Sequence, residues 1–351
     1  MARQMHRSGV SKRARALAMA LLFGHGALST AALAAGPDGM PPAAHGPEAA
    51  LPAAGAQRIA EGWYAHQALL MTLGAGARIV ATVNQPQAQP WMFRVQPSLA
   101  KATLIHGTAF NDEALLAAQV DLVFTSRGDR QALAYQQAGL RVQPMGYSDL
   151  PGLQQAMRDT AQALGDAPTL ARAQAYNQYL DHQAARVRER LGDLPAAQRP
   201  TVLHIASLQP LKVDGSDTLI DQWIQLAGGR NAAVGLKGNL QPVSAEQLLA
   251  WQPDIIVLAA NAGEPRQVPL WQALDAVQQH HVLRNPAGVF AWDRYGTEIA
   301  LQLPWAAQQL HPERFQDLDM AALTRDFYQR FFDYALTSDE TRRLLEGLPP
   351  G

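Results

Sequence analysis

The sequence predicts an α/β protein made of two related lobes, with a long helix between them. Segments with strand and helix patterns alternate along most of the 351 residues, which is typical of a mostly parallel sheet covered by helices. One helix–turn–strand unit occurs twice, which indicates that the chain contains two lobes of the same kind. A stretch with helical periodicity, 169–191, contains neither Gly nor Pro and supplies the long helix.

The repeated unit is clearest at 243–258, which reads VSAEQLLAWQPDIIVL. Ser244 can begin a helix that runs to Trp251, because its side-chain oxygen can accept a hydrogen bond from the first free backbone N–H groups. Pro253 cannot continue that helix, and it biases the residue before it away from the helical region. The apolar run 255–258 then has the length and composition of a strand buried on both faces.

The earlier copy of this unit lies at 111–124, which reads NDEALLAAQVDLVF. When Glu113 is aligned with Glu246, six of twelve positions are identical, and both copies place the Glu eight residues before an Asp. The identical pairs are Glu113/Glu246, Leu115/Leu248, Leu116/Leu249, Ala117/Ala250, Gln119/Gln252 and Asp121/Asp254. This shared pattern favours two related lobes over a chance match.

The other elements follow from apolar patterns that end at Gly or Pro. The expected strands are 78–83, 103–106, 122–124, 141–145, 201–206, 254–258 and 289–292. The expected helices are a short one that begins near Glu113, then 131–138, 153–164, 168–191, 218–227, 244–251, 270–277, 298–310 and 320–334. At ~1.5 Å per residue the helix 168–191 would be ~36 Å long, which is enough to run from one lobe to the other.

The N-terminus has the pattern of an export signal. Residues 1–34 combine five basic residues with a small, apolar stretch and an A-x-A-like end, Ala32-Leu33-Ala34, so a cleavable signal peptide is expected. Residues 35–55 form a leader rich in Pro, Gly and Ala. Removal of residues 1–34 leaves 24 basic and 30 acidic residues, a net charge of −6, which gives no indication of nucleic-acid binding.

The chain contains no Cys, so disulfides, thiolate metal sites, Cys catalysis and lipid attachment through Cys are excluded. With a signal peptide ahead of a globular composition, this predicts a soluble periplasmic protein that is not lipid-anchored through Cys.

Several segments, taken in order, resemble the periplasmic binding proteins of ABC importers for iron–siderophore, haem, cobalamin and similar metal chelates. The resemblance covers roughly residues 56–340. Its most specific segments are Leu73-Gly74-Ala75 before Arg78-Ile79-Val80, Glu113 with Asp121-Leu122-Val123, Leu226 to Ala232, Val243-Ser244 with Glu246, and Pro253-Asp254.

The resemblance implies two Rossmann-like lobes joined by a single long α-helix, with a ligand cleft between the lobes. It also implies the following layout: 56–152 as the N-terminal lobe, 153–198 as connecting helices with the long helix at about 168–191, and 199–351 as the C-terminal lobe with its closing helix. In members of this family one exposed Glu on each lobe pairs with Arg residues of the permease, and Glu113 and Glu246 fall at those positions. The alternative is that both are ordinary first-turn glutamates that stabilise a helix N-terminus.

In such a fold, ligand contacts come from loops at the carboxyl ends of strands. Arg and aromatic side chains together suit a flat, anionic metal chelate. The expected ligand-binding residues are Trp91, Arg94, Trp292, Arg294, Tyr295, Tyr64, His66 and Arg127, with Trp63, Lys212, Asn261 and Arg266 as further candidates. For each of them, loop packing or simple exposure is the alternative. Trp91 and Arg94 fall in a long Gln- and Pro-rich loop, and Trp292, Arg294 and Tyr295 end or follow the expected strand 289–292.

A direct metal site is not expected, although His66, His106 and His204 could converge on a bare metal. His204 falls inside an expected strand, where a buried His with satisfied hydrogen bonds is commoner. Haem would need a Tyr or His axial ligand, and Tyr64, Tyr147, Tyr295 and His66 are available.

We therefore expect a monomeric binding protein that captures a metal chelate, foremost an iron–siderophore-type complex, and delivers it to an ABC importer permease. No intrinsic cofactor is expected. Haem, cobalamin and nickel or cobalt chelates are alternative cargoes. A chelatase-like or nitrogenase-like two-lobed enzyme is an alternative of another class, and an exported scaffold or sensor is a third. The sequence contains no G-x-S-x-G, P-loop or H-E-x-x-H motif, which argues against an enzyme.

Overall fold

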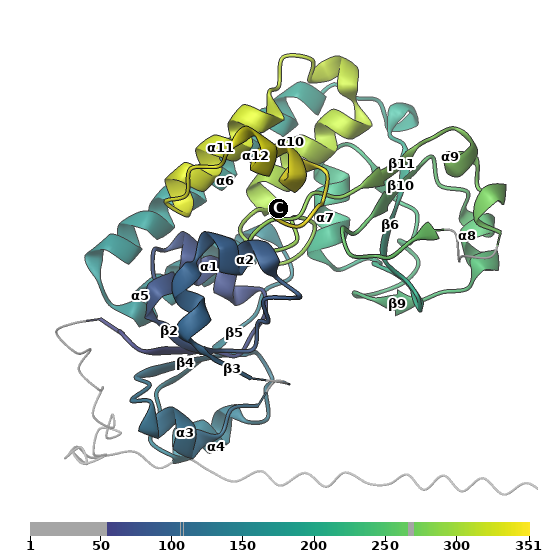
Figure 1. Cartoon of the computed structure of the whole chain (residues 1–351). Coiled ribbons are helices and arrows are strands. Elements are labelled where there is room, and N and C mark those ends of the chain that lie inside the picture. The colour runs from purple at the N-terminus through teal and green to yellow at the C-terminus, as the bar shows by residue number, and fades with distance from the viewer. Residues whose placement is uncertain (1–54, 106, 108, 266–269) are drawn as a thin grey trace, which may run out of the picture. The chain divides into compact units, whose positions relative to one another are not determined.

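The computed structural model describes residues 55–105, 107, 109–265 and 270–351 (Figure 1). The expected signal peptide, nearly all of the expected leader, His106 and Arg266 lie outside the described residues. No helix among the described residues has the length and apolar character needed to cross a membrane.

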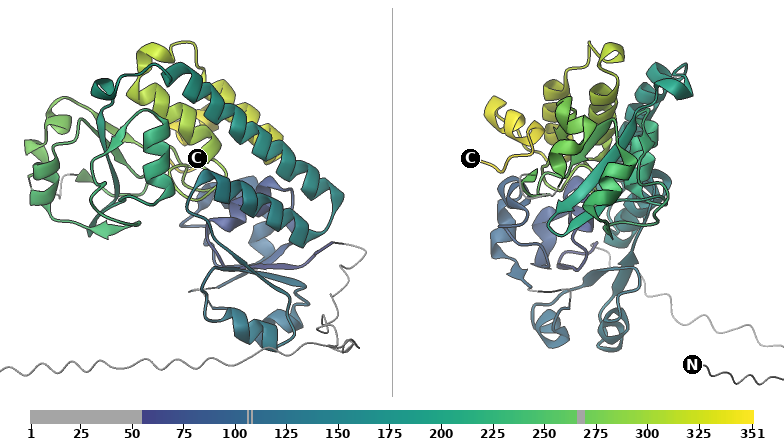
Figure 2. Two further views of the ribbon diagram at one scale, coloured as in Figure 1. Left: turned by 180° about the vertical axis from the view of Figure 1, so that it is seen from behind. Right: turned by 90° about the vertical axis from the view of Figure 1, so that its right-hand side faces the viewer.

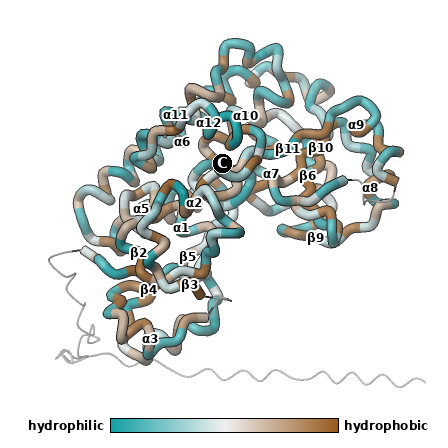
Figure 3. Tube along the Cα trace, in the orientation of Figure 1, coloured by the Kyte–Doolittle hydropathy of each residue, from teal (hydrophilic) through white to brown (hydrophobic). Residues whose placement is uncertain are grey.

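The N-terminal lobe is built on a five-stranded sheet in which every pairing is parallel, in the order β3-β2-β1-β4-β5. The strands are β1 (Ile59–Glu61), β2 (Ile79–Thr82), β3 (Thr103–Leu104), β4 (Leu122–Ser126) and β5 (Val142–Met145). The helices are α1 (His66–Thr72), α2 (Pro90–Val95), α3 (Asp112–Ala117), α4 (Ala132–Gln137) and α5 (Leu150–Leu164). The central strands β1 and β4 are almost entirely buried, and β4 is strongly hydrophobic at its start (Figure 3), as expected for a parallel sheet covered by helices.

The C-terminal lobe has a mixed sheet in the order β11-β10-β6-β7-β9, with β8 also paired to β6. Its strands are β6 (Thr201–Leu208), β7 (Leu211–Val213), β8 (Arg230–Asn231), β9 (Gln241–Pro242), β10 (Ile255–Leu258) and β11 (Val282–Arg284). Its helices are α7 (Leu219–Leu226), α8 (Ala245–Trp251), α9 (Asp275–Gln278), α10 (Ile299–Leu310), α11 (Met320–Phe331) and α12 (Ser338–Leu345). Only β7 runs antiparallel to its neighbours β6 and β9.

The long helix α6 (Ala167–Leu191) has 25 residues and joins the two sheets in the chain (Figure 2). It begins where the Asp166 carboxylate accepts a hydrogen bond from the Thr169 amide at 2.9 Å, and it packs against α5 and α10. This confirms the expected long helix.

Several contacts tie the N-terminal lobe to helices that follow α6. The Arg172 guanidinium donates to the carbonyls of Thr72 (2.9 Å) and Phe331 (2.8 Å), and it pairs with Asp333 at 3.0 Å. The hydroxyls of Thr72 and Thr297 lie 2.8 Å apart. One hydrophobic core cluster contains buried residues from both lobes and from α6, so the junction between the lobes is packed.

The internal repeat is confirmed in three dimensions. Helix α3 leads into β4, and helix α8 leads into β10. In each copy a Gln with left-handed backbone lies two residues before the Asp: Gln119 at φ 54° and Gln252 at φ 38°. Asp121 accepts from the Gln57 amide at 2.8 Å, and Asp254 accepts from the Thr201 amide at 2.6 Å. In both lobes, therefore, the Asp carboxylate binds the backbone at the start of the neighbouring strand.

The expected strand 289–292 is wrong, because this segment is a loop. The amides of Val289 and Phe290 donate to the buried Glu298 carboxylate at 3.1 and 2.7 Å. They therefore bond to a side chain, whereas the amides of a strand would bond to the backbone of a neighbouring strand. The expected Gln/Pro loop around Trp91 is instead partly helical, as α2. The expected helices 270–277 and 320–334 are shorter, and left-handed residues, Leu270 and Asp333, lie at their margins.

Candidate functional site

Loops at the carboxyl ends of the strands bring the two lobes into contact. Tyr147, which follows β5, donates its hydroxyl to the backbone carbonyl of Tyr295 in the C-terminal lobe, and the two rings lie 5.8 Å apart. Trp63, which follows β1, meets the Tyr147 ring edge-on at 5.3 Å. The Tyr295 hydroxyl in turn accepts from the Asn239 amide at 2.7 Å. Three partly exposed aromatic rings therefore extend from one lobe to the other, and we call Trp63, Tyr147 and Tyr295 the aromatic series.

A pocket of about 240 Å³ is formed by loops from both lobes. Its wall in the N-terminal lobe is the segment 87–91, after β2, and its wall in the C-terminal lobe includes Ala260 and Asn261, after β10. The rest of the lining is Ala287, Gly288, Ala291, Gly347, Leu348 and Pro349. A second pocket, of about 260 Å³, lies in the N-terminal lobe, where Arg127 and Tyr147 are among its lining residues. Both pockets lie where ligands bind in open α/β sheets.

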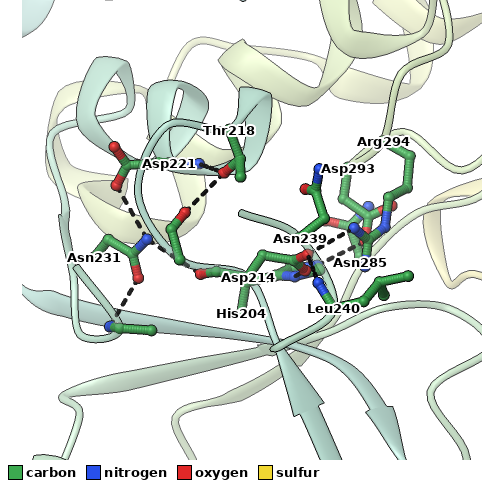
Figure 4. A network of polar contacts seen from close by, with 12 residues as sticks. His204, Asp214, Thr218, Asp221, Asn231, Asn239, Leu240, Asn285, Asp293 and Arg294 are labelled. Carbon is green, nitrogen blue, oxygen red and sulfur yellow. Dashed lines mark hydrogen bonds and ion pairs between the residues drawn. The ribbon is translucent and has the colours of Figure 1, made fainter. Parts of the chain in front are cut away.

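A buried network of charged side chains is centred on His204 (Figure 4). His204, on β6, makes hydrogen bonds through Nδ1 to Asp214 at 2.8 Å and through Nε2 to Asp293 at 2.7 Å. The other oxygen of Asp214 accepts from Arg294 Nη1 and from the Leu240 amide, both at 2.9 Å. His204, Asp214 and Asp293 are fully buried, whereas the Arg294 side chain keeps 16% of its surface exposed.

The network favours the charged forms of His204, Asp214 and Arg294. Burial acts to lower the pKa of His204, but the hydrogen bonds to Asp214 and Asp293 outweigh it and raise that pKa above its ordinary value. Burial acts to raise the pKa of Asp214, yet His204 and Arg294 hold it well below its usual range. Desolvation likewise opposes the charge of Arg294, and the attraction of Asp214 and Asp293 still raises its pKa. Arg294 is thus a fixed cation at the edge of the network.

Four of the expected ligand-binding residues lie at accessible or half-buried positions near these loops. Arg294 and Tyr295 belong to the loop that contacts Tyr147, Tyr64 is 42% exposed, and Arg127 is exposed and lines the second pocket. Of the further candidates, Asn261 lines the first pocket, Trp63 belongs to the aromatic series, and Lys212 is half-buried on β7.

Other candidate side chains are occupied within the protein. Trp292 is fully buried and donates its indole N–H to Glu298 at 3.1 Å, so the expectation that it contacts a ligand is not supported. Trp91 lines the first pocket but is 2% exposed, and its indole donates to the Leu348 carbonyl at 2.8 Å. Arg94 points to Glu340, with N–O distances of 3.3 and 3.4 Å.

Two of the candidate histidines, His66 and His204, are not arranged as metal ligands. His66 is fully buried, with Nδ1 2.6 Å from the Glu61 carboxylate and Nε2 2.9 Å from the Thr160 hydroxyl. Both nitrogens of His204 are likewise occupied. Among the described residues, no group of three or more His, Asp or Glu is arranged to hold a metal ion.

Sequence reasoning missed Asp214 and Glu298 as partners in the site. Asp214 begins an Asp-Gly-Ser-Asp segment that has the pattern of a turn, yet it contacts both His204 and Arg294. Glu298 accepts from two backbone amides, the Trp292 indole and the Tyr328 hydroxyl, and it fixes the loop that carries Arg294. Burial raises the pKa of Glu298 to about 7, although these donors oppose the rise.

Glu113 and Glu246 occupy equivalent positions in the first turns of α3 and α8, and both are exposed. Asn111 and Ser244 begin these helices, with their side-chain oxygens accepting from the amides of Ala114 and Gln247. The Ser244 hydroxyl lowers the pKa of Glu246, so this carboxylate is ionised at neutral pH.

Comparison with known proteins gives the family. A family model described as periplasmic binding protein matches residues 62–287. The molybdate-binding protein MolA of Haemophilus influenzae is 30% identical over 162 residues, which cover 44% of this chain and 45% of MolA, so the match spans less than half of that relative.

Solved structures share the fold at low sequence identity. A periplasmic solute binding protein from Veillonella parvula has a TM-score of 0.72 at 24% identity, over 84% of this chain and 92% of that one. MolA bound to molybdate has a TM-score of 0.71 at 21% identity (81% and 95% covered), and Ni(II)-bound CeuE of Helicobacter pylori has 0.66 at 18% identity (83% and 94% covered). The chain therefore belongs to the periplasmic binding protein family.

Proposed function

We propose that this protein captures a metal-containing anion between its lobes and delivers it to an ABC importer permease. One observation carries the proposal: Arg294 is held by Asp214 at 2.9 Å and stays partly exposed, next to the Tyr295–Tyr147 contact between the lobes. A guanidinium fixed in this way can donate its remaining N–H groups to the oxygens of an anion.

The proposed ligand contacts are Arg294, Tyr295, Tyr64 and Arg127, which keep exposed surface; Arg94 is also exposed but pairs with Glu340. Trp63 and Tyr147 would supply aromatic surface, and Asn261 would contribute from the wall of the first pocket. His66 and Trp292 are fully buried, so they would not contact the ligand directly and would instead fix the loops that do.

An iron–siderophore-type chelate is the first candidate cargo. The aromatic series Trp63, Tyr147 and Tyr295 favours it, because ring faces can cover the organic body of a chelate while Arg294 pairs with its anionic oxygens. Haem, cobalamin and nickel or cobalt chelates fall in the same chemical class.

A metal oxyanion such as molybdate is the second candidate. The pocket between the lobes, at about 240 Å³, is smaller than the roughly 300–1,000 Å³ usual for drug-sized ligands. The similarity to MolA, which binds molybdate, points the same way.

The decisive experiment is native mass spectrometry of the protein purified from the periplasm, with elemental analysis of the same sample. A bound mass of several hundred daltons that contains iron, cobalt or nickel would support a chelate, whereas a small adduct that contains molybdenum would support the oxyanion. A protein that carries no metal and also fails to bind molybdate or ferric chelates in calorimetry would refute the proposal.

Delivery would depend on Glu113 and Glu246. Two carboxylates at equivalent positions on two lobes can make a two-point contact with Arg residues of a permease, and the packed junction between the lobes would limit changes in their spacing. Export to the periplasm would depend on the signal peptide expected at residues 1–34.

A further inference from the structure

We infer that His204, which lies beneath the proposed site, is a positioning residue whose protonation keeps Arg294 available to an anionic cargo. The inference rests on the proposed function, because it concerns the affinity of the same site for an anion. The affinity for cargo would then depend on the charge of one buried imidazole.

The hydrogen bonds of His204 define its charge. Each ring nitrogen faces a carboxylate oxygen, at 2.8 Å from Asp214 and at 2.7 Å from Asp293. An ionised carboxylate only accepts hydrogen bonds, so with both carboxylates ionised each ring nitrogen carries a proton and the ring is an imidazolium. The imidazolium is fully buried, where such a charge persists only because its partners are charged and close.

The network is balanced only while His204 is charged. It then contains two cations, His204 and Arg294, and two anions, Asp214 and Asp293. Among the described residues, Asp293 makes its side-chain hydrogen bond to His204 alone, and its Oδ1 has no partner although it is buried. If His204 lost its proton, the network would carry one net negative charge directly behind Arg294.

Arg294 transmits this change to the proposed site. In the described part of the chain its only side-chain hydrogen bond runs from Nη1 to Asp214, which leaves its other N–H groups for a ligand. With His204 charged, Asp214 divides its charge between two cations. With His204 neutral, Arg294 would have to compensate both carboxylates, and the net negative charge of the network would repel an anion bound next to Arg294.

Few other charged groups face His204. Strands β7, β8 and β10 flank β6, and the Trp223 ring from α7 meets the imidazole edge-on at 6.0 Å. Within the described part of the chain, the Asp221 carboxylate is linked to the network through Asn231 alone, which donates both to it and to the Asp214 carbonyl. Tyr295 is joined to Asn239 on the exposed side. The protonation of His204 is therefore governed by Asp214, Asp293 and Arg294.

The first test is calorimetry of the wild-type protein with two probes, sodium molybdate and a ferric tris-catecholate complex, between about pH 6 and pH 10. We expect the affinity for the anion to fall by about tenfold as pH rises through the pKa of His204, since one unit charge is added close to the bound anion. Linkage requires that anion binding in this range takes up protons, which titrations in buffers of different ionisation enthalpy measure directly.

The second test uses charge replacement. His204→Gln should weaken anion binding by about tenfold and remove its pH dependence, because the network then carries a fixed net negative charge. Adding Asp293→Asn removes that charge, so the double variant should recover most of the affinity. His311→Gln is the matched control: His311 is also buried in the C-terminal lobe, but it contacts the Gly228 carbonyl and lies outside the network.

The outcomes separate the two proposals. Failure of the wild-type protein to bind either probe would overturn the proposed function, and this inference with it. Wild-type binding that neither varies with pH nor takes up protons would overturn the inference alone, and so would His204→Gln with unchanged affinity. If His204→Gln does not fold, as judged by circular dichroism, the proton-uptake measurement on the wild-type protein still decides.

Discussion

The buried Glu298 carboxylate should make the stability of this protein fall as pH rises through neutrality. Its pKa is about 7 in the folded protein, against 4.5 for an unperturbed Glu. Between these two values the unfolded chain releases a proton that the folded protein retains, so the free energy of unfolding decreases as pH rises. Below about pH 4.5 the contribution is fully present, and above about pH 7 it is lost.

The size of the effect follows from the difference between the two pKa values. At about 1.4 kcal/mol per pKa unit, the shift to about 7 corresponds to roughly 3 kcal/mol. Solvent screening does not reduce it, because the carboxylate is fully buried. The assay is chemical denaturation at a series of pH values, for the wild-type protein and for Glu298→Gln.

The variant isolates Glu298 from every other titrating group. Gln cannot ionise, so the difference between the two proteins should shrink by roughly 3 kcal/mol between about pH 5 and pH 8. At low pH the variant should be less stable, because its amide N–H₂ must face at least one of the amides of Val289 and Phe290, which are also donors. Parallel stability curves for the two proteins would refute the reasoning.

Three further predictions concern Arg294, the paired glutamates and the paired helix caps. Arg294→Lys should weaken anion binding by about tenfold or more, because an ammonium cannot keep the Asp214 contact and also present a planar set of donors. Unchanged affinity in calorimetry would show that Arg294 does not contact the anion. Glu113→Arg combined with Glu246→Arg should abolish uptake by the reconstituted importer while cargo affinity stays unchanged, and persistent uptake would exclude the docking role. Asn111→Ala and Ser244→Ala should each lower the free energy of unfolding by about 1 kcal/mol, measured by denaturation, because each removes an equivalent helix cap; a loss at only one of the two positions would contradict their structural equivalence.

The fold could be predicted where its signals are local. Asp166 and Pro168 mark the start of α6 within a few residues, and the Glu–Asp spacing of the repeat reappears as two matching helix–strand units. The loop 289–292 could not be predicted in this way. Its apolar residues read as a strand, but its amides bond to Glu298, and nothing within the loop itself signals that partner.

The candidate site was predicted less well, for a similar reason. Arg294 and Tyr295 were selected because Arg and aromatic residues suit an anionic chelate, and they do lie where the lobes meet. Trp292, two residues earlier, has the same apparent suitability but faces the core. The partner of Arg294 is Asp214, 80 residues away, and only the folded sheet brings the two together.

The contacts of Arg172 with the carbonyls of Thr72 and Phe331 have a consequence for how empty and loaded protein would compete for the proposed permease. They tie the N-terminal lobe to α11 through α6, so we expect the junction between the lobes to change little when cargo binds. An importer that recognises this protein by the spacing of its two lobes would then find the empty and the loaded carriers nearly alike in outline. Empty carriers would compete for the same docking surface, and the rate of import would depend on the ratio of loaded to empty protein in the periplasm.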